Sequence, residues 1–481
     1  MRSLSKLNFV TRNVDPSQPL RVVVVGGGLA GMAAAVALQS AGAAVTLLEA
    51  RKSLGGRAGS FEDPKTGEIL DNCQHVLLGC CTNLLDFYRR LGVEHLIRFE
   101  RTIRFVDNHG NQYGLSGTPG LPAPLHLAPS LLRFGALTLR ERLSLSRAMT
   151  AMIRLGRAGR LALADVPFGQ WLADHGQPQS LITKLYEPIL VGSLNEDPKR
   201  ASSAYAIQVF QDALLSNAAG YVLGLPDCPL ARLYERIPCG DVRLGTRVAE
   251  LTFSGKSVTG VRLQSGEALE ADAVVLATNH HALQKWIPLE WRERDRRFAG
   301  LDQLQSVPIL GAHLFFDRPV LRESHAAFLE GPLQWLFRKD AEGRVVHGVI
   351  SAARDWLEVP RDEALGRFHD QIRKTFPAAA EAKLERGVTV IEKRATFSPV
   401  PGVDDHRPQQ APPAGGIANL LLAGDYTLTG WPATMEGAVR SGYLAAEAVL
   451  AGQSATNRSF VVPDLGLQWP SRLLSRVAAV G

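Results

Sequence analysis

The fold of this chain is decided by residues 21–57, which read RVVVVGGGLAGMAAAVALQSAGAAVTLLEARKSLGGR. Residues 22–25 are a continuous run of valines, which is typical of a strand buried on both faces. The glycine-rich turn after them opens residues 32–40, whose Ala, Val and Leu content predicts a tightly packed helix. A second strand over residues 45–48, closed by Glu49, completes a βαβ unit. We therefore expect an α/β protein with a doubly wound domain at this end.

The turn itself has the spacing of a dinucleotide site, with Gly26, Gly28 and Gly31 in a G-x-G-x-x-G pattern. The first glycine allows the tight turn, the second lets a pyrophosphate approach the backbone, and the third permits close packing of helix on strand. The helix that starts here also offers free N–H groups to phosphates. Glu49 ends the second strand, where a carboxylate accepts hydrogen bonds from a ribose diol and disfavours a 2′-phosphate.

Two further features favour FAD over NAD. Gly56-Arg57 follows closely and adds a second backbone approach with a fixed cation for a diphosphate. Residues 420–425 (LLLAGD) predict a strand ending in a carboxylate that can bind ribityl hydroxyls. A helix beginning near Met435 can point its N-terminus at the electron-rich edge of a flavin. Because the sequence has no second G-x-G-x-x-G pattern, we expect an external electron donor rather than a built-in NAD(P)H site.

The alternation of patterns along the chain predicts two discontinuous domains between two end segments. The expected boundaries are a flexible leader at 1–19, an FAD-binding domain from 20–82, 225–281 and 396–453, an interleaved mixed α+β substrate-binding domain from 83–224 and 282–395, and a C-terminal tail at 454–481. Binding sites usually lie between such domains.

Composition excludes several function classes. The chain has 481 residues, 46% of them apolar, and a net charge of +6, which is modest for this length. No nucleic-acid module accompanies that charge, so we expect no nucleic-acid partner. The five cysteines are odd in number and form no C-x-x-C pair, which argues against disulfides and zinc and fits a reducing, cytoplasmic compartment. No apolar run approaches the ~18 to 20 residues of a transmembrane helix.

These motifs resemble those of the flavin amine oxidase and phytoene desaturase superfamily, from about Val22 to Leu450. The resemblance implies a Rossmann-type, GR2-like FAD domain, with Val248 meeting the adenine and Ala277-Thr278 covering it. The full set of residues expected to bind FAD is Gly26, Gly28, Leu29, Ala30, Gly31, Glu49, Ala50, Arg51, Gly56, Arg57, Val248, Ala277, Thr278, Gly424, Asp425, Thr434, Met435 and Gly437. No metal site is expected.

A closer resemblance is to the squalene-associated branch, the hydroxysqualene dehydroxylases of hopanoid and sterol precursor synthesis. It rests on residues 71–80 (DNCQHVLLGC), 83–88 (NLLDFY), 186–188 (YEP) with 193–195 (SLN), and 430–437 (GWPATMEG). This chain departs from the branch at Cys73, usually glycine, and Tyr186, usually tryptophan. The resemblance implies that an allylic hydroxyl leaves as water and that a hydride from reduced flavin replaces it, giving squalene. Carotenoid-type desaturation, amine oxidation and a non-catalytic isoprenoid carrier remain alternatives.

For the chemistry, His75 is the first candidate for a general acid, because the DNCQH segment should fold back near the flavin. A structural histidine bonded to backbone fits the same residue. Trp431 and Tyr186 are the leading candidates for stabilising a developing cation, with Phe315 and Trp335 beside them. Asn195 and Glu196 are weaker candidates for the acid.

A hydrophobic isoprenoid substrate would be held in membranes, and one stretch suits peripheral contact with the inner face of a membrane. Residues 125–161 contain seven arginines and a single acidic residue, Glu141, with Leu, Met and Ile between them. The tail from Leu467 (LQWPSRLLSRVAAV) has similar character. The same pattern also fits a solvated basic face over an ordinary core.

Overall fold

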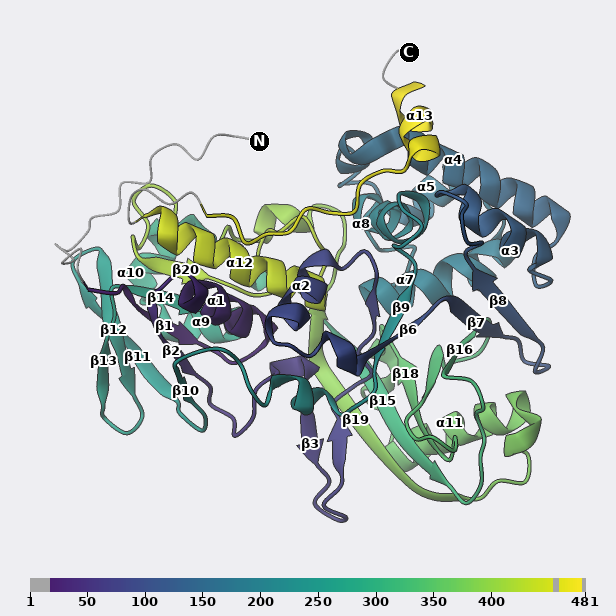
Figure 1. Cartoon of the computed structure of the whole chain (residues 1–481), viewed down its shortest axis with the longest axis horizontal. Coiled ribbons are helices and arrows are strands. Elements are labelled where there is room, and N and C mark those ends of the chain that lie inside the picture. The colour runs from purple at the N-terminus through teal and green to yellow at the C-terminus, as the bar shows by residue number, and fades with distance from the viewer. Residues whose placement is uncertain (1–17, 453–457, 478–481) are drawn as a thin grey trace.

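The computed structural model describes residues 18–452 and 458–477, so most of the expected leader and parts of the expected tail lie outside the described residues. One half of the molecule is built on a parallel five-stranded sheet (Figure 1). Its strands, in spatial order, are β10 (Asp241–Arg243), β2 (Ala44–Leu48), β1 (Arg21–Val25), β14 (Ala273–Leu276) and β20 (Leu420–Leu422). The expected α/β class is confirmed, and pieces from all three expected FAD-domain segments share this sheet.

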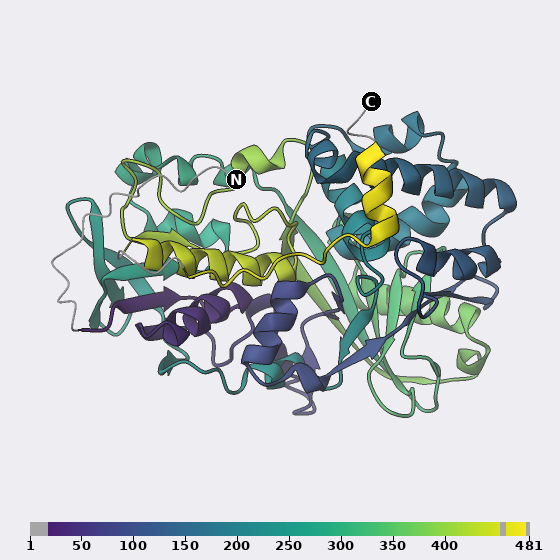
Figure 2. The ribbon, with the colours of Figure 1, turned by 45° about the horizontal axis from the view of Figure 1, so that its top comes forward.

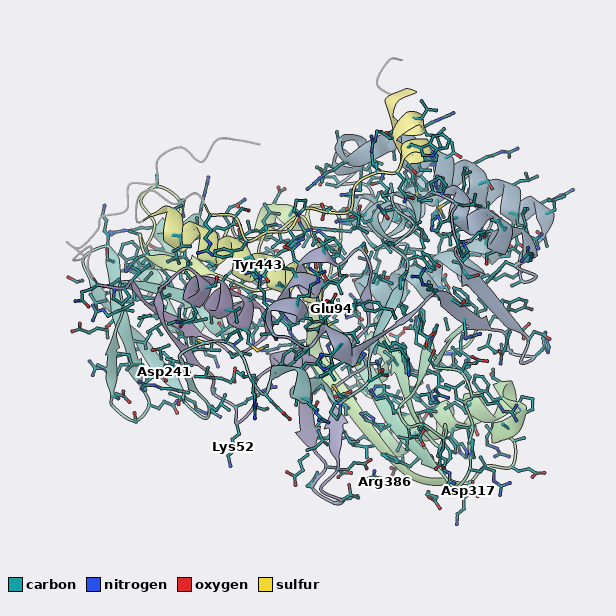
Figure 3. The ribbon with its side chains drawn as sticks, viewed as in Figure 1. Lys52, Glu94, Asp241, Asp317, Arg386 and Tyr443 are labelled. Carbon is teal, nitrogen blue, oxygen red and sulfur yellow. The ribbon has the colours of Figure 1, made fainter. Side chains whose placement is uncertain are left out.

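Two helices from opposite ends of the chain pack together on this sheet: α1 (Leu29–Ser40) and α12 (Met435–Ala451). Figure 1 shows them side by side, purple and yellow. A Cβ placed on Gly442 would lie 2.2 Å from the carbonyl oxygen of Ala30, so only glycine permits this approach. Helix α2 (Thr82–Arg90) joins them, because Tyr443, labelled in Figure 3, donates a hydrogen bond to Asp86 at 2.9 Å.

Smaller elements border this half. An antiparallel sheet contains β11 (Val248–Ser254), β12 (Ser257–Leu263) and β13 (Ala268–Glu270). The helices α9 (His280–Trp286) and α10 (Leu289–Arg294) follow β14. A hairpin of β3 (Ser60–Glu62) and β4 (Ile69–Asp71) extends toward the other half, where Arg386 (Figure 3) donates to Asp63 at 2.7 Å.

The other half contains a mixed seven-stranded sheet. In spatial order its strands are β19 (Leu384–Phe397), β15 (Ser306–Phe316), β18 (Val345–Ile350), β17 (Trp335–Arg338), β16 (His325–Phe328), β7 (Thr102–Val106) and β8 (Gln112–Ser116). Only β16 and β7 pair in parallel; the other pairs are antiparallel. One face packs against α11 (Arg361–Thr375), with Phe368 lying over Gly348. A three-stranded sheet of β5 (Leu77–Leu78), β9 (Leu223–Pro226) and β6 (Ile97–Glu100) lies near the opposite face.

A helical lobe completes this half (Figure 2). It comprises α3 (Ala128–Arg133), α4 (Leu139–Leu161), α5 (Phe168–Asp174), α6 (Gln179–Leu181), α7 (Glu187–Leu194), α8 (Ser203–Phe210) and α13 (Trp469–Val477), with π-helical turns at Ile182–Tyr186 and Gln211–Leu215. Helices α3 and α4 are separate, because Thr138 and Glu141 form a capping box that starts a new helix. Among the described residues, no helix is both long and apolar enough to cross a membrane.

Candidate active site

The glycine turn after β1 is open on one side and crowded on the other. Gly26 has φ of +113°, and a Cβ there would lie 2.5 Å from the carbonyl oxygen of Ala277. A Cβ on Gly31 would lie 1.9 Å from the carbonyl oxygen of Gly26. At Gly28, by contrast, a Cβ would meet nothing within 4 Å. The open side therefore lies at the amino end of α1, where Leu29 and Ala30 form the first turn and anionic groups are favoured.

Glu49 ties this turn to the second glycine loop. Its buried carboxylate accepts hydrogen bonds from the backbone N–H of Gly27 at 2.6 Å and of Arg51 at 2.8 Å. The N–H of Gly55 donates to the carbonyl of Gly27 at 2.9 Å, and a Cβ on Gly56 would lie 3.2 Å from the Cα of Gly28. The two glycine loops thus meet, and Ala50 lies exposed beside them.

Arg57 and Asp425 bring the two ends of the chain together. Their side chains form an ion pair of 2.6 Å although they stand 368 positions apart. Arg57 also donates to the carbonyl of Ala395 at 2.5 Å. Burial lowers the pKa of Arg57, but the charge of Asp425 and its hydrogen bond outweigh this and raise that pKa. Asp425 follows Gly424, whose N–H donates to Ser441 at 2.8 Å.

The turn that enters α12 is held by its own side chains. Thr434 caps the helix, since its hydroxyl accepts the N–H of Gly437 at 3.0 Å. A Cβ on Gly437 would lie 2.6 Å from the carbonyl oxygen of Pro432, so the turn requires glycine there. Met435 is the first residue of α12, and the amino end of this helix carries a positive partial charge that favours an anionic group.

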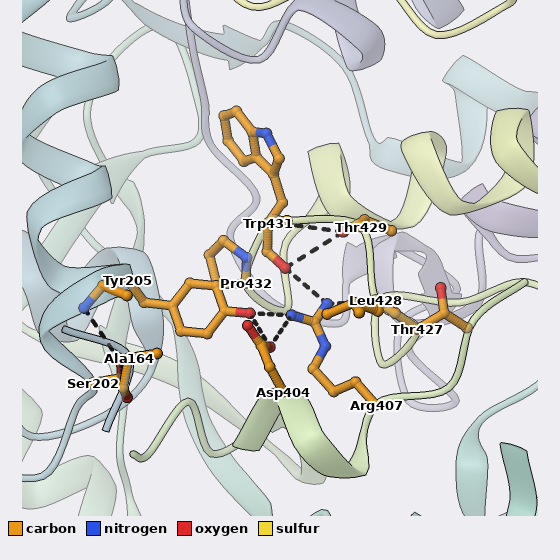
Figure 4. A network of polar contacts seen from close by, with 12 residues as sticks. Ala164, Ser202, Tyr205, Asp404, Arg407, Thr427, Leu428, Thr429, Trp431 and Pro432 are labelled. Atoms are coloured by element: carbon orange, nitrogen blue, oxygen red, sulfur yellow. Dashed lines mark hydrogen bonds and ion pairs between the residues drawn. The ribbon is translucent and has the colours of Figure 1, made fainter. Parts of the chain in front are cut away.

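Arg407 clamps this C-terminal segment onto the helical lobe (Figure 4). Its buried guanidinium donates to the carbonyls of Thr427 at 2.5 Å and Trp431 at 2.8 Å. It also pairs with Asp404 at 3.0 Å and donates to the hydroxyl of Tyr205 on α8. Sequence reasoning missed this arginine, because it stands in no motif and its partner on the helical lobe, Tyr205, lies 202 positions away in sequence.

The residues expected around the adenine lie beside the glycine turn and beside Glu49. Ala277 follows β14 and packs against Gly26 and Gly31, and the Thr278 hydroxyl is buried without a partner among the described residues. The segment leading to Val248 is attached to Glu49, because the N–H of Thr246 donates to the Glu49 carbonyl at 2.8 Å.

His75 is half-buried, and its Nδ1 lies 3.0 Å from the carbonyl of Cys73. A carbonyl only accepts, so Nδ1 carries the proton. Burial lowers the pKa of His75 despite this hydrogen bond. The imidazole is therefore neutral near pH 7 and presents Nε2 as an acceptor, which suits a proton acceptor better than a general acid.

The aromatic candidates occupy separate places. Tyr186 is fully buried in the helical lobe, beside Phe168 and Phe210, and its hydroxyl donates to Gln177 at 3.1 Å. Trp431 lies in the turn before α12, with the guanidinium of Arg440 5.1 Å from its ring centre. The structure does not bring these two rings together as one cage.

Phe315 and Trp335, from the seven-stranded sheet, are also engaged. Arg386 lies 3.7 Å from the Phe315 ring centre, and the Trp335 indole donates to the carbonyl of Pro188 at 3.2 Å. Two weaker acid candidates are held in structural contacts. Asn195 donates to Thr396 at 2.9 Å, and Glu196 pairs with Arg354, whose hydrogen bond helps to lower the pKa of Glu196 although burial opposes it.

A pocket next to the Arg57–Asp425 pair adds residues that sequence reasoning missed. It is lined in part by His280, His281 and Arg394. The two histidines begin α9, just beyond the carboxyl end of β14, which is the edge at which ligands bind in parallel α/β sheets, and this position could have signalled them.

A family model described as flavin containing amine oxidoreductase matches residues 29–450. The chain belongs to this family. It is 27% identical to the 15-cis-phytoene desaturase of Synechococcus elongatus, over 91% of this chain and 98% of the relative. It is also 27% identical to the zeta-carotene desaturase of a Synechocystis species, over 90% and 98% of the two chains.

Among solved structures, putrescine oxidase bound to putrescine superposes with a TM-score of 0.66 at 17% identity, covering 90% of this chain and all (100%) of that chain. A cyclohexylamine oxidase from Brevibacterium oxydans gives a TM-score of 0.61 at 20% identity, covering 91% and 99%. These likenesses support the fold of the flavin-containing amine oxidoreductases.

Membership of the family implies FAD, and the residues present fit that cofactor. The open space at Gly28, the unobstructed start of α1 and the Arg57–Asp425 pair provide groups for the diphosphate and the ribityl chain. FAD supplies hydride exchange when it is bound. The glycine turn, Arg57 and Asp425 are the residues that would hold and orient it.

Proposed function

We propose that this chain is an FAD-dependent oxidoreductase that exchanges a hydride with a long isoprenoid substrate. The observation that carries the cofactor half of the proposal is the convergence of the glycine turn, Arg57 and Asp425. The substrate half is supported by relatives that match this chain over almost their full length and are carotenoid desaturases by name. Those relatives favour carotenoid-type desaturation over the dehydroxylation of hydroxysqualene.

An apolar wall supports a hydrocarbon-rich substrate. Segment 73–78 packs against one face of the seven-stranded sheet. The wall consists of Cys73, Val76, Leu78, Leu223, Leu225, Ile309, Trp335, Phe337 and Val349. The same segment is anchored to the cofactor loop, since the Asn72 amide donates to the carbonyl of Gly56 at 3.4 Å. The apolar wall is therefore close to the cofactor loop, and a substrate chain would have to meet its partly buried members, Val76, Leu78, Ile309 and Trp335.

Dehydroxylation of hydroxysqualene is the second candidate. It is favoured by the resemblance of residues 71–80 to that branch. In this reaction the allylic C–O bond breaks, the hydroxyl takes up a proton and leaves as water, and a hydride from the reduced cofactor forms the new C–H bond. In desaturation a hydride and a proton leave neighbouring carbons. Both directions require an external electron partner.

Anaerobic mixing separates the two directions. Oxidised protein loaded with FAD is mixed with a phytoene-type polyene precursor, and reduced protein with hydroxysqualene, while flavin absorbance and products are followed. Bleaching in the first arm supports desaturation, and reoxidation with squalene formation in the second supports dehydroxylation. Flavin absorbance that changes in neither arm, although isoprenoid binds, would leave a non-catalytic carrier and overturn the proposal.

We also propose that the protein docks on an anionic membrane through one composite surface, formed by α3, α4 and α13. Helix α13 packs against α4, so two basic apolar stretches far apart in sequence become neighbours (Figure 2). Its exposed apolar residues are Leu132, Leu139, Leu143, Leu161, Trp469 and Leu473. The exposed arginines Arg140, Arg147 and Arg154 lie on one side of α4, because seven residues make nearly two turns of a helix. Leu143 lies on the same side, because it stands about one turn from both Arg140 and Arg147.

The acidic residue of this stretch does not reach the composite surface. Glu141, the single acidic residue of residues 125–161, is buried and points inward, where it accepts from the Ser180 hydroxyl at 2.6 Å and lies 3.5 Å from Lys184. Basic and apolar side chains thus remain on the outside. That combination fits an anionic lipid headgroup layer over acyl chains.

A further inference from the structure

A carboxylate is buried in the first turn of α12, between two residues expected to bind the cofactor. Glu436 is fully buried and stands between Met435 and Gly437. Its oxygens accept the backbone N–H groups of Asn83 at 3.2 Å and Leu84 at 2.8 Å, and the side-chain amide of Asn83 at 2.9 Å. Glu436 therefore caps the amino end of α2, a helix whose own N-cap residue makes no side-chain hydrogen bond.

The contacts of Glu436 show that its carboxylate is charged. Both oxygens accept hydrogen bonds, and every partner is a donor: two backbone N–H groups, the Asn83 amide and Nε of Arg440 at 2.8 Å. A proton on either oxygen would find no acceptor among the hydrogen bonds of the described residues. Because a buried ion is costly unless an opposite charge lies beside it, Glu436 depends on Arg440.

Arg440 stands between two acidic residues. It lies one turn after Glu436, and its buried guanidinium also pairs with Asp464 in segment 458–468, which lies between α12 and α13 in the chain. Asp464 is partly exposed and lies 3.5 Å from Arg157 of α4. Arg157 is 68% exposed, so water and salt screen its charge. The buried part of the cluster is thus the pair of Glu436 and Arg440.

The charges of this pair matter because of where α12 begins. Its amino end is expected to face the electron-rich edge of the flavin, and reduction places further negative charge on that edge. An uncompensated Glu436 at this position would oppose reduction, and an uncompensated Arg440 would favour it. Capping α2 requires acceptors but no arginine, so the structural role of Glu436 does not account for the buried ion pair.

We propose that Arg440 sets the reduction potential of the bound flavin, by cancelling the charge that Glu436 would otherwise present at the amino end of α12. The inference rests on the cofactor half of the proposed function and is independent of the substrate. Arg440 acts through its charge rather than through contact with reacting atoms, and Asp464 moderates that charge from the other side.

The test compares the reduction potentials of FAD-loaded proteins. Each protein is reduced anaerobically together with a reference dye, and the absorbance of flavin and dye gives the potential. Arg440→Met should lower the potential and Glu436→Gln should raise it, each by at least about 30 mV, which is a tenfold change in the ratio of reduced to oxidised flavin for a two-electron couple. The double variant Glu436→Gln/Arg440→Met removes both charges and should return toward the wild-type potential.

Asp464→Asn keeps the buried pair, so it tests the sign even if Arg440→Met loses stability, and it should raise the potential. Arg157→Gln removes the exposed arginine of the same cluster; it is the matched control and should leave the potential unchanged. A residue that serves only as a cap would lower Tm without moving the potential. Wild-type potentials in both Glu436→Gln and Asp464→Asn would overturn the inference, as would a rise in Arg440→Met. A wild type that binds no FAD would instead defeat the proposed function.

Discussion

At the scale of single residues, two glycines of one turn have different tasks. Gly31 is required by the fold, since its Cβ would lie 1.9 Å from a backbone oxygen, whereas Gly28 faces open space. We expect Gly31→Ala to destabilise the protein by about 3 kcal/mol. Gly28→Ala should keep the wild-type Tm but weaken FAD binding at least about tenfold, because a methyl group there meets the pyrophosphate. Thermal unfolding of the FAD-free proteins and FAD titration measure the two effects; full FAD affinity in Gly28→Ala would contradict the assignment.

His126 gives a prediction for pH dependence. It is buried with neither ring nitrogen bonded among the described residues, and burial lowers its pKa to about 4. The unfolded chain takes up a proton below about pH 6.5, but the folded chain does so only near pH 4. The burial of His126 therefore costs no free energy of unfolding above about pH 6.5. As the pH falls from there toward about 4, the unfolded chain is favoured progressively and part of that free energy is lost.

Replacing this histidine should reduce that loss. We expect His126→Leu to be more stable than the wild type at pH 5 by about 2 kcal/mol, relative to the difference between them at pH 8. Urea unfolding at the two pH values measures it. His109→Leu, at an exposed site, serves as control and should show no such gain. Equal pH dependence of His126→Leu and the wild type would refute the explanation.

At the scale of elements, the composite surface of α3, α4 and α13 predicts membrane binding. Leu139→Glu/Leu143→Glu replaces two exposed leucines, 68% and 53% exposed, with charges that an anionic bilayer repels. We expect at least a tenfold loss of co-sedimentation with phosphatidylglycerol vesicles at low salt. The secondary structure and Tm should stay unchanged, because neither side chain is buried.

Leu289→Glu provides the matched control for that experiment. This leucine is 66% exposed on α10, in the half of the molecule built on the five-stranded sheet. Its substitution should leave vesicle binding intact. If both variants bind vesicles as the wild type does, or if the wild type never binds them, α3, α4 and α13 form a solvated basic face.

At the scale of the whole molecule, Arg407 links the cofactor half to the helical lobe. It is fully buried, and its loss would leave Asp404 and several carbonyls without their donor. We expect Arg407→Met to lose about 3–5 kcal/mol of stability and to release FAD during purification. Denaturant unfolding and the ratio of flavin to protein absorbance measure this. Arg296→Met, at an exposed position, serves as the control and should keep the stability and the FAD content of the wild type. If Arg407→Met also kept both, Arg407 would not be the residue that links the two halves.

Sequence alone determined the α/β class, and through family resemblance the cofactor, because the signals are local. Gly26, Gly28 and Gly31 stand between one strand and one helix, and their spacing has a direct geometric meaning for the backbone. Arg57 and Asp425 could each be expected at one cofactor site because each stands in a motif of its own, whereas their ion pair was not predicted. The cofactor contacts themselves remain a prediction.

Only the tertiary structure decided which distant side chains meet. Glu436 caps a helix that begins more than 350 positions earlier, the Arg407 network joins segments about 200 positions apart, and α13 reaches α4 across most of the chain. Tyr186 has an aromatic ring suited to a substrate site, yet packing placed it in the helical core. Such contacts arise from the burial of many apolar side chains at once, and no short stretch of sequence encodes that collective outcome.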